Sequence, residues 1–282
     1  MNISQLIENP DSAHIKRVRA LYLKKNRQKF SRVIAEGVNA AEVLVNNHPE
    51  AVVEILVEES NPKSDGNASK WQKRLNQLVQ SAQAKNLIVN YVTPRVMKSI
   101  SENAEGVICI GKTIVFDDVR KNAGAKDVVV VCKETSDPGN AGMLIRACVA
   151  FGVSKVIFAG DSVDHWNPKV VRASVGAVFQ VAIQNAPDLK TALKYLRDSG
   201  YSIVAADGVG TAQNVPHDLK SSAVLPKANS IAWLFGNEAH GLECSELDLA
   251  DEVIRIEMLP NAVESLNLAG ALHICLYETF VA

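Results

Sequence analysis

The sequence lacks the cysteine spacing that zinc sites and disulfide-rich domains need. It holds five cysteines in 282 residues, and no two of them form a CxxC pair. Clustered cysteines would indicate either kind of site, and without them neither a zinc site nor a disulfide framework is suggested, so we expect no bound metal. Scattered free thiols are typical of a reducing compartment. The five positions are Cys109, Cys132, Cys148, Cys244 and Cys275.

Long hydrophobic runs are also absent. No uninterrupted apolar stretch approaches the roughly 18 residues of a transmembrane helix. Residues 1–14 contain acids and a proline where a signal peptide would have its apolar region. The composition, 47% hydrophobic and 22% charged, is that of a globular protein with a sizeable core. We therefore expect a soluble protein of the cytoplasm that has no membrane partner.

Several well-known nucleotide-binding and catalytic motifs are missing as well. The sequence has no Walker loop, no GxGxxG fingerprint and no Ser–His–Asp triad. A nucleotide-dependent oxidoreductase would need its glycine fingerprint after the first strand of the domain. This class of enzyme is therefore poorly supported.

Charge is distributed unevenly along a nearly neutral chain. Residues 1–120 hold 17 basic and 13 acidic residues, whereas residues 121–282 hold 13 and 18. Residues 16–32 contain eight basic residues and no acid. Such a cluster can neutralise RNA phosphates, and a solvated helix face is the equally weighted alternative. The candidate RNA-binding residues are Lys16, Arg17, Lys24, Lys25, Arg27, Lys29 and Arg32.

Hydrophobic periodicity predicts an α/β protein with two domains. The first domain, residues 1–112, alternates helices with strands and begins with a helix over 12–30. A polar linker is expected at 113–126. The second domain, residues 127–282, has continuous apolar strands between helices, which indicates a mostly parallel sheet covered on both faces. The strands expected there cover 127–134, 155–160, 181–183, 202–207, 230–236 and 252–258.

Three glycine- or asparagine-rich segments follow strands of the second domain. Ligands of open α/β sheets bind at the carboxyl ends of strands, so these segments are the candidate site. In residues 136–152, Asn140 lies near a helix start and Arg146 lies among apolar neighbours. A buried arginine needs an anionic partner, which would be an internal carboxylate or an RNA phosphate.

The other two segments are residues 232–242 and 256–271. In the first, a glycine directly after a strand indicates a close backbone approach to a ligand, although an ordinary loop is as consistent with the pattern. In the second, Ser265 and Asn267 open a final helix near 265–280. Ser265 is a candidate residue of the site. The alternative is a purely structural role as the N-cap of this helix.

Together these segments resemble the SpoU/TrmH branch of the SPOUT RNA methyltransferases. The family's three motifs, N-x-G-x-x-x-R, F/M-G-x-E-x-x-G-L and E/S-S-L-N-V/L-x-x-A, correspond to Asn140–Arg146, Phe235–Leu242 and Glu264–Ala271. Residues 171–176, VRASVG, also look like a family segment. The resemblance covers about residues 125–282. Residues 29–45 look like part of the ribosomal-protein-like RNA-binding domain that precedes many ribosomal-RNA members.

The resemblance implies an RNA 2'-O-ribose methyltransferase with S-adenosylmethionine as methyl donor. It implies a C-terminal α/β domain with a deep trefoil knot, a rare exception to unknotted chains, and an obligate homodimer. It favours 23S ribosomal RNA as substrate, with a transfer-RNA methyltransferase or a non-catalytic RNA-binding or assembly protein as alternatives. The implied catalytic residues are Asn140, Arg146, Glu238, Ser265 and Asn267. The implied donor-binding residues are Leu234, Phe235, Gly236, Ile256, Met258 and Leu266.

Two positions depart from the family pattern. Asp137 stands where many members carry asparagine before the PGN sequence, which adds a negative charge near the RNA site. The loop Met258–Ser265 is one residue longer than in some members. The contacts that Asp137 makes are therefore a question for the structure.

Overall fold

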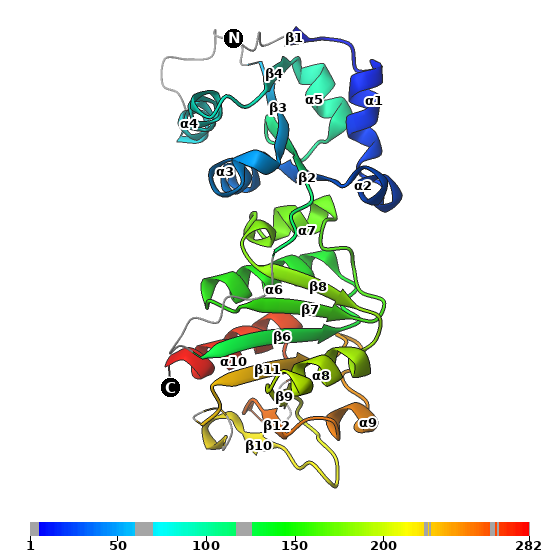
Figure 1. Cartoon of the computed structure of the whole chain (residues 1–282), viewed down its shortest axis with the longest axis vertical. Coiled ribbons are helices and arrows are strands. Elements are labelled where there is room, and N and C mark those ends of the chain that lie inside the picture. The colour runs from blue at the N-terminus through cyan, green and yellow to red at the C-terminus, as the bar shows by residue number, and fades with distance from the viewer. Residues whose placement is uncertain are drawn as a thin grey trace. The chain divides into compact units, whose positions relative to one another are not determined.

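The computed structural model describes residues 6–59, 70–116, 126–222, 225, 227–259, 263 and 265–281. Contacts between residues divide the chain into two compact units. One unit contains residues 1–114 together with 164–180, and the other contains residues 115–163 and 181–282. Each unit has its own sheet, and the two are described separately (Figure 1).

The first unit is built on a five-stranded mixed sheet in the order β1-β4-β3-β5-β2. β3 pairs in parallel with β4, whereas β5 lies antiparallel between β3 and β2. Helices α1 and α5 cover one face, and α3 and α4 cover the other (Figure 1). The strands are β1 Leu6–Ile7, β2 Arg32–Glu36, β3 Val52–Glu58, β4 Val89–Val92 and β5 Val107–Lys112. The helices are α1 Ala13–Ala20, α2 Lys24–Phe30, α3 Gly37–Asn47, α4 Lys70–Ala84, α5 Pro94–Ile100 and α7 Pro168–Ala173.

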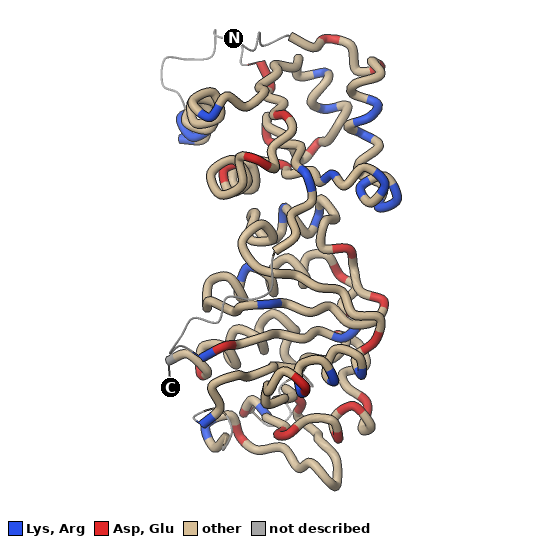
Figure 2. The backbone as a smooth tube through the Cα atoms, in the orientation of Figure 1, with Lys and Arg blue, Asp and Glu red and all other residues tan. Residues whose placement is uncertain are grey.

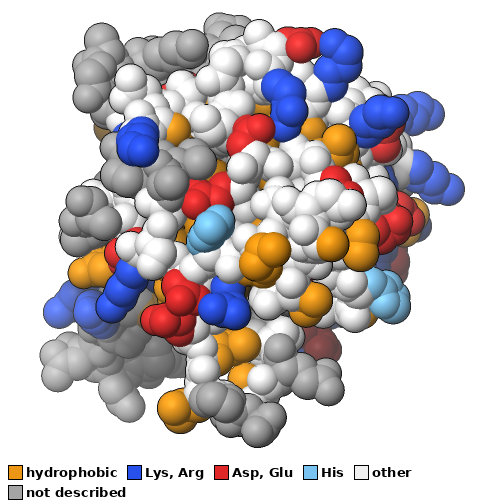
Figure 3. Space-filling model, turned by 90° about the horizontal axis from the view of Figure 1, so that it is seen from below, with side chains coloured by type: hydrophobic (Ala, Val, Ile, Leu, Met, Phe, Trp, Pro, Cys, Tyr) orange, Lys and Arg blue, Asp and Glu red, His pale blue; other side chains and the backbone are white. Residues whose placement is uncertain are grey.

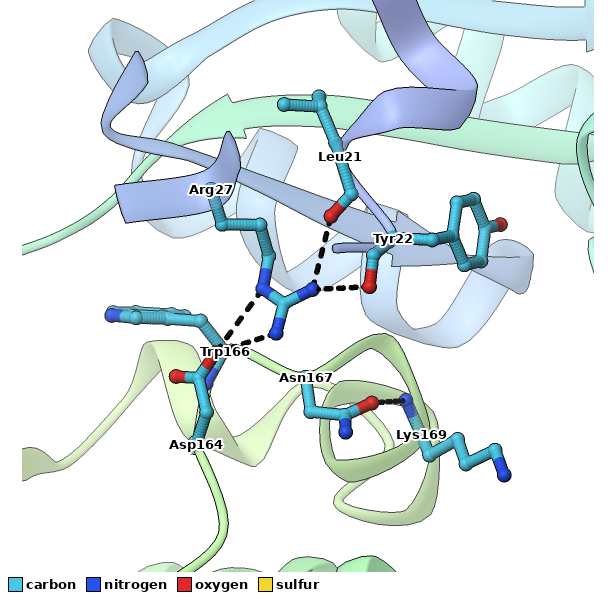
Figure 4. A network of polar contacts seen from close by, with 7 residues as sticks. All are labelled: Leu21, Tyr22, Arg27, Asp164, Trp166, Asn167 and Lys169. Carbon is cyan, nitrogen blue, oxygen red and sulfur yellow. Dashed lines mark hydrogen bonds and ion pairs between the residues drawn. The ribbon is translucent and has the colours of Figure 1, made fainter. Parts of the chain in front are cut away.

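The single helix predicted over 12–30 is wrong, because the chain turns between α1 and α2. The guanidinium of Arg27 closes this turn: its Nη1 donates to the carbonyls of Leu21 and Tyr22 over 3.0 and 2.8 Å (Figure 4). Carbonyls at a helix end have no partner within the helix and need another donor. A side chain from the next helix supplies that donor here, and so the turn is stable.

The segment 164–180 belongs to the first unit although it lies far along the chain. Arg27 Nη2 lies 2.6 Å from Asp164 Oδ2, and both side chains are largely buried (Figure 4). Arg172 forms an ion pair with Glu36, a strand residue whose carboxylate is almost fully buried. The partners of two buried charges in residues 1–114 thus lie on this segment, which explains why it packs there.

Glu36 also accepts a hydrogen bond from the hydroxyl of Tyr22. Burial raises the pKa of Tyr22, and the hydrogen bond to Glu36 raises it further. The phenol therefore stays protonated and remains a donor. Arg172 and Tyr22 together satisfy a carboxylate that burial would otherwise make costly.

The sequence analysis placed residues 164–180 in the C-terminal domain of residues 127–282. In the structure these residues pack with the first unit. Residues 117–125 of the expected linker lie outside the described residues. The assignment of RNA binding to residues 1–112 and of catalysis to residues 127–282 remains a prediction.

The second unit contains a seven-stranded parallel sheet in the order β10-β12-β9-β11-β6-β7-β8. The expected α/β fold with a mostly parallel sheet is confirmed. Sequence periodicity predicted six of these strands and missed the two-residue strand β10. The strands are β6 Asp127–Lys133, β7 Lys155–Ala159, β8 Ala182–Ala186, β9 Ser202–Ala206, β10 His217–Asp218, β11 Ser230–Phe235 and β12 Glu252–Arg255.

Helices cover both faces of this sheet (Figure 1). α8 packs its apolar side chains on one face, where alternate residues of β6, β9 and β11 form a continuous core. α6 and α10 pack against each other on the opposite face, and Trp233 of β11 donates a hydrogen bond to Thr279 of α10 over 3.0 Å. The helices are α6 Pro138–Ala150, α8 Leu189–Asp198, α9 Cys244–Leu247 and α10 Leu268–Val281.

The cysteines follow the sequence expectation of free thiols. Cys109, Cys132, Cys148 and Cys275 are buried, and burial raises the pKa of each, to about 12 for Cys275. Cys244 is exposed. In the described part of the chain, no helix is long and apolar enough to span a membrane.

Candidate active site

A cavity of about 390 Å³ lies at the carboxyl ends of β9, β11 and β12 and at the start of α10. This is where parallel α/β sheets bind ligands, because the loops that follow the strands converge there. The second and third motif segments both contribute to its walls. Its lining residues are Ala206, Asp207, Gly208, Phe235, Gly236, Asn237, Glu238, Ala239, Gly241, Leu242, Ile254, Ile256, Met258, Ser265, Leu266, Asn267, Leu268 and Ala271.

The loop after β11 folds tightly back on itself. Asn237 and Gly241 exchange two backbone hydrogen bonds, of 3.1 and 2.9 Å. A Cβ at Gly236 would lie 2.4 Å from the carbonyl carbon of Gly241 and 2.7 Å from the amide nitrogen of Leu242. Any side chain at Gly236 would push this loop open. The close backbone approach at Gly236 is to the loop itself, and the predicted approach to a ligand stays a prediction.

A chain of hydrogen bonds joins the three motif segments. Asn267 Nδ2 donates to Asn140 Oδ1 over 3.0 Å, and Asn140 Nδ2 donates to Glu238 Oε1 over 3.2 Å. The three residues come from the first turn of α6, the loop after β11 and the start of α10. Glu238 and Asn267 also line the cavity. Three of the five predicted catalytic residues therefore form one connected group.

Helix caps at the site differ from the expected ones. Asn267, and not Ser265, caps α10, because its Oδ1 accepts from the amide of Ala269 over 3.0 Å. Ser265 is exposed and lines the cavity. Asp137 caps α6 by accepting from the amide of Asn140 over 2.7 Å. The negative charge of Asp137 thus has a structural partner, since carboxylates are favoured at helix N-termini.

Arg146 is exposed on α6, which corrects the expectation of a buried arginine. Its neighbours Leu144, Ile145 and Ala147 are buried, but the helix turns the guanidinium toward solvent. Among the described residues, none forms a hydrogen bond or ion pair with Arg146, and it does not line the cavity. Of the two predicted partners of Arg146, an internal carboxylate is therefore not found among the described residues.

Most of the predicted donor-binding residues line the cavity, and one does not. Leu234 is fully buried in the core between β11 and α8, so its side chain cannot reach a ligand. The alternation of side chains along a strand explains the difference, since successive residues face opposite sides of the sheet. The predicted residues that do line the cavity are Phe235, Gly236, Ile256, Met258 and Leu266.

Asp207 is a lining residue that sequence reasoning missed. It directly follows β9, and its Oδ1 accepts from the amides of Val209 and Gly210 over 2.8 and 2.9 Å. The signal was available, because the strand 202–207 was predicted and its carboxyl end belongs to the site edge. No motif drew attention to this strand end. Among the described residues, no group of His, Cys, Asp and Glu is arranged to hold a metal ion.

Most side chains of the basic run at 16–32 are solvent-exposed. Figure 2 shows in blue where the basic residues lie along α1 and α2. Arg27 is the exception, and this corrects its place among the predicted RNA-binding residues. Its side chain is 3% exposed, pairs with Asp164 and donates to the carbonyls of the turn, so it cannot also bind RNA phosphates. Arg32 is half-buried and donates to the carbonyls of Phe30 and Ser31. The exposed members of the run are Lys16, Arg17, Lys24, Lys25 and Lys29.

Comparison with known proteins gives a family and a fold. Residues 127–277, more than half of the chain, match the SpoU rRNA Methylase family. The chain is 25% identical over 255 residues to the 23S rRNA (guanosine-2'-O-)-methyltransferase RlmB of Bordetella pertussis, covering 88% of this chain and 97% of that protein. It is 25% identical over 267 residues to an uncharacterized tRNA/rRNA methyltransferase of Synechocystis, covering 94% and 89%.

The fold is also that of a solved relative. The crystal structure of an AdoMet-bound rRNA methyltransferase from Sinorhizobium meliloti superposes with a TM-score of 0.77 at 24% identity, covering 98% of this chain and 97% of that one. The family match spans all three segments whose side chains are joined by the hydrogen bonds of Asn140, Glu238 and Asn267. The chain therefore belongs to the SpoU rRNA methylase family.

Proposed function

We propose that this protein transfers a methyl group from S-adenosylmethionine to a ribose 2'-hydroxyl of RNA, with 23S ribosomal RNA as substrate. The observation that carries the proposal is the hydrogen-bonded group of Asn140, Glu238 and Asn267 beside the cavity. The named activity of the Bordetella relative, which aligns along nearly its whole length, supports the ribosomal substrate.

The cavity suits the proposed donor. Its volume falls within the range of roughly 300–1,000 Å³ that small-molecule sites occupy. Apolar side chains of Ile254, Ile256 and Leu266 can pack against an adenine ring, while carboxylates and backbone groups can meet the polar parts. When bound, the donor supplies a methyl group activated by a positively charged sulfur. Phe235, Gly236 and Met258 complete the proposed donor site.

Arg146 would position the RNA. A guanidinium has a pKa far above neutrality and is a poor base, so holding a phosphate and ribose is the role that suits it. Its planar fork can contact two phosphate oxygens at once. The exposure of Arg146 supports this role, because an RNA phosphate can reach it without displacing an internal partner.

The hydrogen-bonded group would keep the loops in place for that reaction. Asn140 uses both its amide oxygen and its amide nitrogen within the group, so its orientation is defined. Preorganised polar groups lower barriers because they need not rearrange during the reaction. Ser265 lines the cavity next to this group, and we assign it to the organisation of the substrate.

Exposed basic residues of α1 and α2 would bind the RNA backbone. Lys24, Lys25 and Lys29 lie on one short helix, and Lys16 and Arg17 lie on the helix before it. Lysines and arginines that neutralise phosphates release counterions, which makes binding sensitive to salt. This distribution supports a substrate-binding role for residues 1–112.

A homodimer is part of the proposal. Large apolar side chains on α10, namely Ile274, Tyr277 and Phe280, are 40%, 55% and 37% exposed, and Met143 of the adjacent α6 is 44% exposed. Apolar side chains clustered on one face are typical of association surfaces. Light scattering of the full chain at micromolar concentration tests this, and an active monomer would refute it. The trefoil knot and the cytoplasmic location remain predictions.

Mapping of 2'-O-methyl groups tests the substrate. We expect one ribose of 23S ribosomal RNA to be methylated in cells with the protein and unmethylated in cells without it. A site that appears only in transfer RNA would instead favour the transfer-RNA alternative, with which the name of the Synechocystis relative is consistent. No change in either RNA would refute the proposed activity.

Calorimetry separates the enzyme from a non-catalytic RNA-binding protein of the same fold. The enzyme should bind S-adenosylmethionine at one site per chain. A pure RNA-binding protein has no need of the donor cavity. It should bind RNA and show no heat of binding when S-adenosylmethionine is added.

A further inference from the structure

Among the described residues that line the donor cavity, two are acidic and none is basic. Asp207 and Glu238 line it, and none of its described lining residues is lysine, arginine or histidine. On the face drawn in Figure 3, by contrast, basic and acidic side chains lie next to one another. The described lining of the cavity thus carries an excess of negative charge.

Asp207 is held so that one oxygen remains available to a ligand. Its Oδ1 is engaged by the amides of Val209 and Gly210. Its Oδ2 is 3.9 Å from the position that a Cβ on Gly241 would take, and Gly241 is also a lining residue. In the described part of the chain, Oδ2 has no hydrogen-bonding or ion-pairing partner. The two amides thus fix the carboxylate at the cavity wall.

The ligands of the proposed reaction differ in charge. S-adenosylmethionine has a sulfonium, an ammonium and a carboxylate, for a net charge of +1. When the methyl carbon passes to the ribose oxygen, the carbon–sulfur electron pair stays on sulfur as a neutral thioether and the hydroxyl proton is released to water. S-adenosylhomocysteine, the product, keeps the ammonium and the carboxylate and has no net charge.

We propose that Asp207 is a specificity residue that makes the cavity prefer the cationic donor to the neutral product. The inference rests on the proposed function. Unit charges a few ångströms apart near a protein surface attract each other strongly enough to separate two otherwise identical ligands. Methyl transfer removes the charge that Asp207 stabilises, so the reaction itself weakens the hold on the product.

The test compares Asp207→Asn with the wild-type full chain by calorimetry. Asparagine keeps an oxygen that can accept from the two loop amides, so the loop should be retained while the charge is lost. The probes are S-adenosylmethionine, S-adenosylhomocysteine and sinefungin, an analogue in which a carbon that bears an amine replaces the methylated sulfur. Groups common to donor and product cancel when the ratio of their Kd values is taken.

We expect Asp207→Asn to weaken the donor and sinefungin on the order of tenfold and to change the product little. The matched control is Asp198→Asn, which removes the same charge from the exposed face of α8, outside the cavity lining. That variant should leave all three Kd values unchanged.

Equal weakening of all three ligands would overturn the inference, because Asp207 would then contact a group that donor and product share. An unchanged Kd for every ligand would also overturn it. Failure of the wild-type chain to bind the donor at all would instead contradict the proposed function. If the wild-type chain binds donor and product, and Asp207→Asn leaves the ratio of their Kd values unchanged, only this inference is contradicted.

Discussion

Arg27 in the first unit and Arg146 in the second are arginines of helices with opposite surroundings. Arg27 is 3% exposed, pairs with Asp164 and closes the turn between α1 and α2. Arg146 is exposed and has no partner among the described residues. A buried and fully hydrogen-bonded guanidinium stabilises a fold, whereas an exposed one without an internal partner is available to a substrate. Their environments assign a structural role to the first and support a substrate role for the second.

Replacing Arg146 tests the functional side of this comparison and should have the largest effect. Arg146→Ala should lower kcat by about two to three orders of magnitude, the usual cost of losing one stabilising donor at a reacting group. Arg146→Lys should restore little activity, because a point charge cannot reproduce the planar fork. A methyl-transfer assay measures both variants.

A melting curve provides the control for Arg146→Ala. The melting temperature should change little, since the side chain is exposed and makes no described contact. Donor affinity should also be retained. A large loss of stability, with activity lost only in proportion to unfolding, would mean that Arg146 has a structural role like that of Arg27.

Replacing Arg27 should act on stability. Arg27→Ala leaves Asp164 buried without its partner and should lower the free energy of unfolding by about 3–5 kcal/mol. The double variant Arg27→Met with Asp164→Leu should recover part of this loss, because an apolar pair leaves no uncompensated charge. Denaturant unfolding measures both. Unchanged stability with weaker RNA binding would mean that Arg27 binds RNA after all.

The exposed lysines of α2 extend the comparison to RNA binding. Replacing Lys24, Lys25 and Lys29 together by glutamate should weaken RNA binding and flatten its dependence on salt, by a slope of roughly 0.7–0.9 for each lost phosphate contact. Stability and donor affinity should not change. The control reverses two exposed lysines of α8, Lys190→Glu with Lys194→Glu, and its effect is compared per reversed charge. Equal loss of RNA binding in both variants would indicate non-specific attraction.

The smallest effect is expected at the start of α6. Asp137→Ala removes the side chain that caps this helix and should cost about 1 kcal/mol of stability. Asp137→Asn should be nearly neutral, because asparagine is an equally good cap. Thermal unfolding distinguishes the two variants. If Asp137→Asn were as destabilising as Asp137→Ala, the charge and not the hydrogen bond would be what α6 requires.

Much of the architecture followed from local patterns. Continuous apolar runs predicted the α/β class and six of the seven strands in the sheet of the second unit, because side-chain periodicity reflects which face is buried. The glycine after β11 was singled out by its position, although its close backbone contact is with its own loop and the predicted contact with a ligand stays a prediction. The order and spacing of three motifs indicated the SpoU family, and the family match bears this out.

What the sequence alone determined was therefore the class of fold, the family and the segments that meet at the site. Only the tertiary structure decided which charges are buried: Arg27 looked like its exposed neighbours until Asp164, 137 positions away, was seen beside it. The same holds for Leu234, which faces the core, and for Asp207, which faces the cavity. Periodicity is a local property, whereas the burial of a charge depends on partners that only the folded chain brings together.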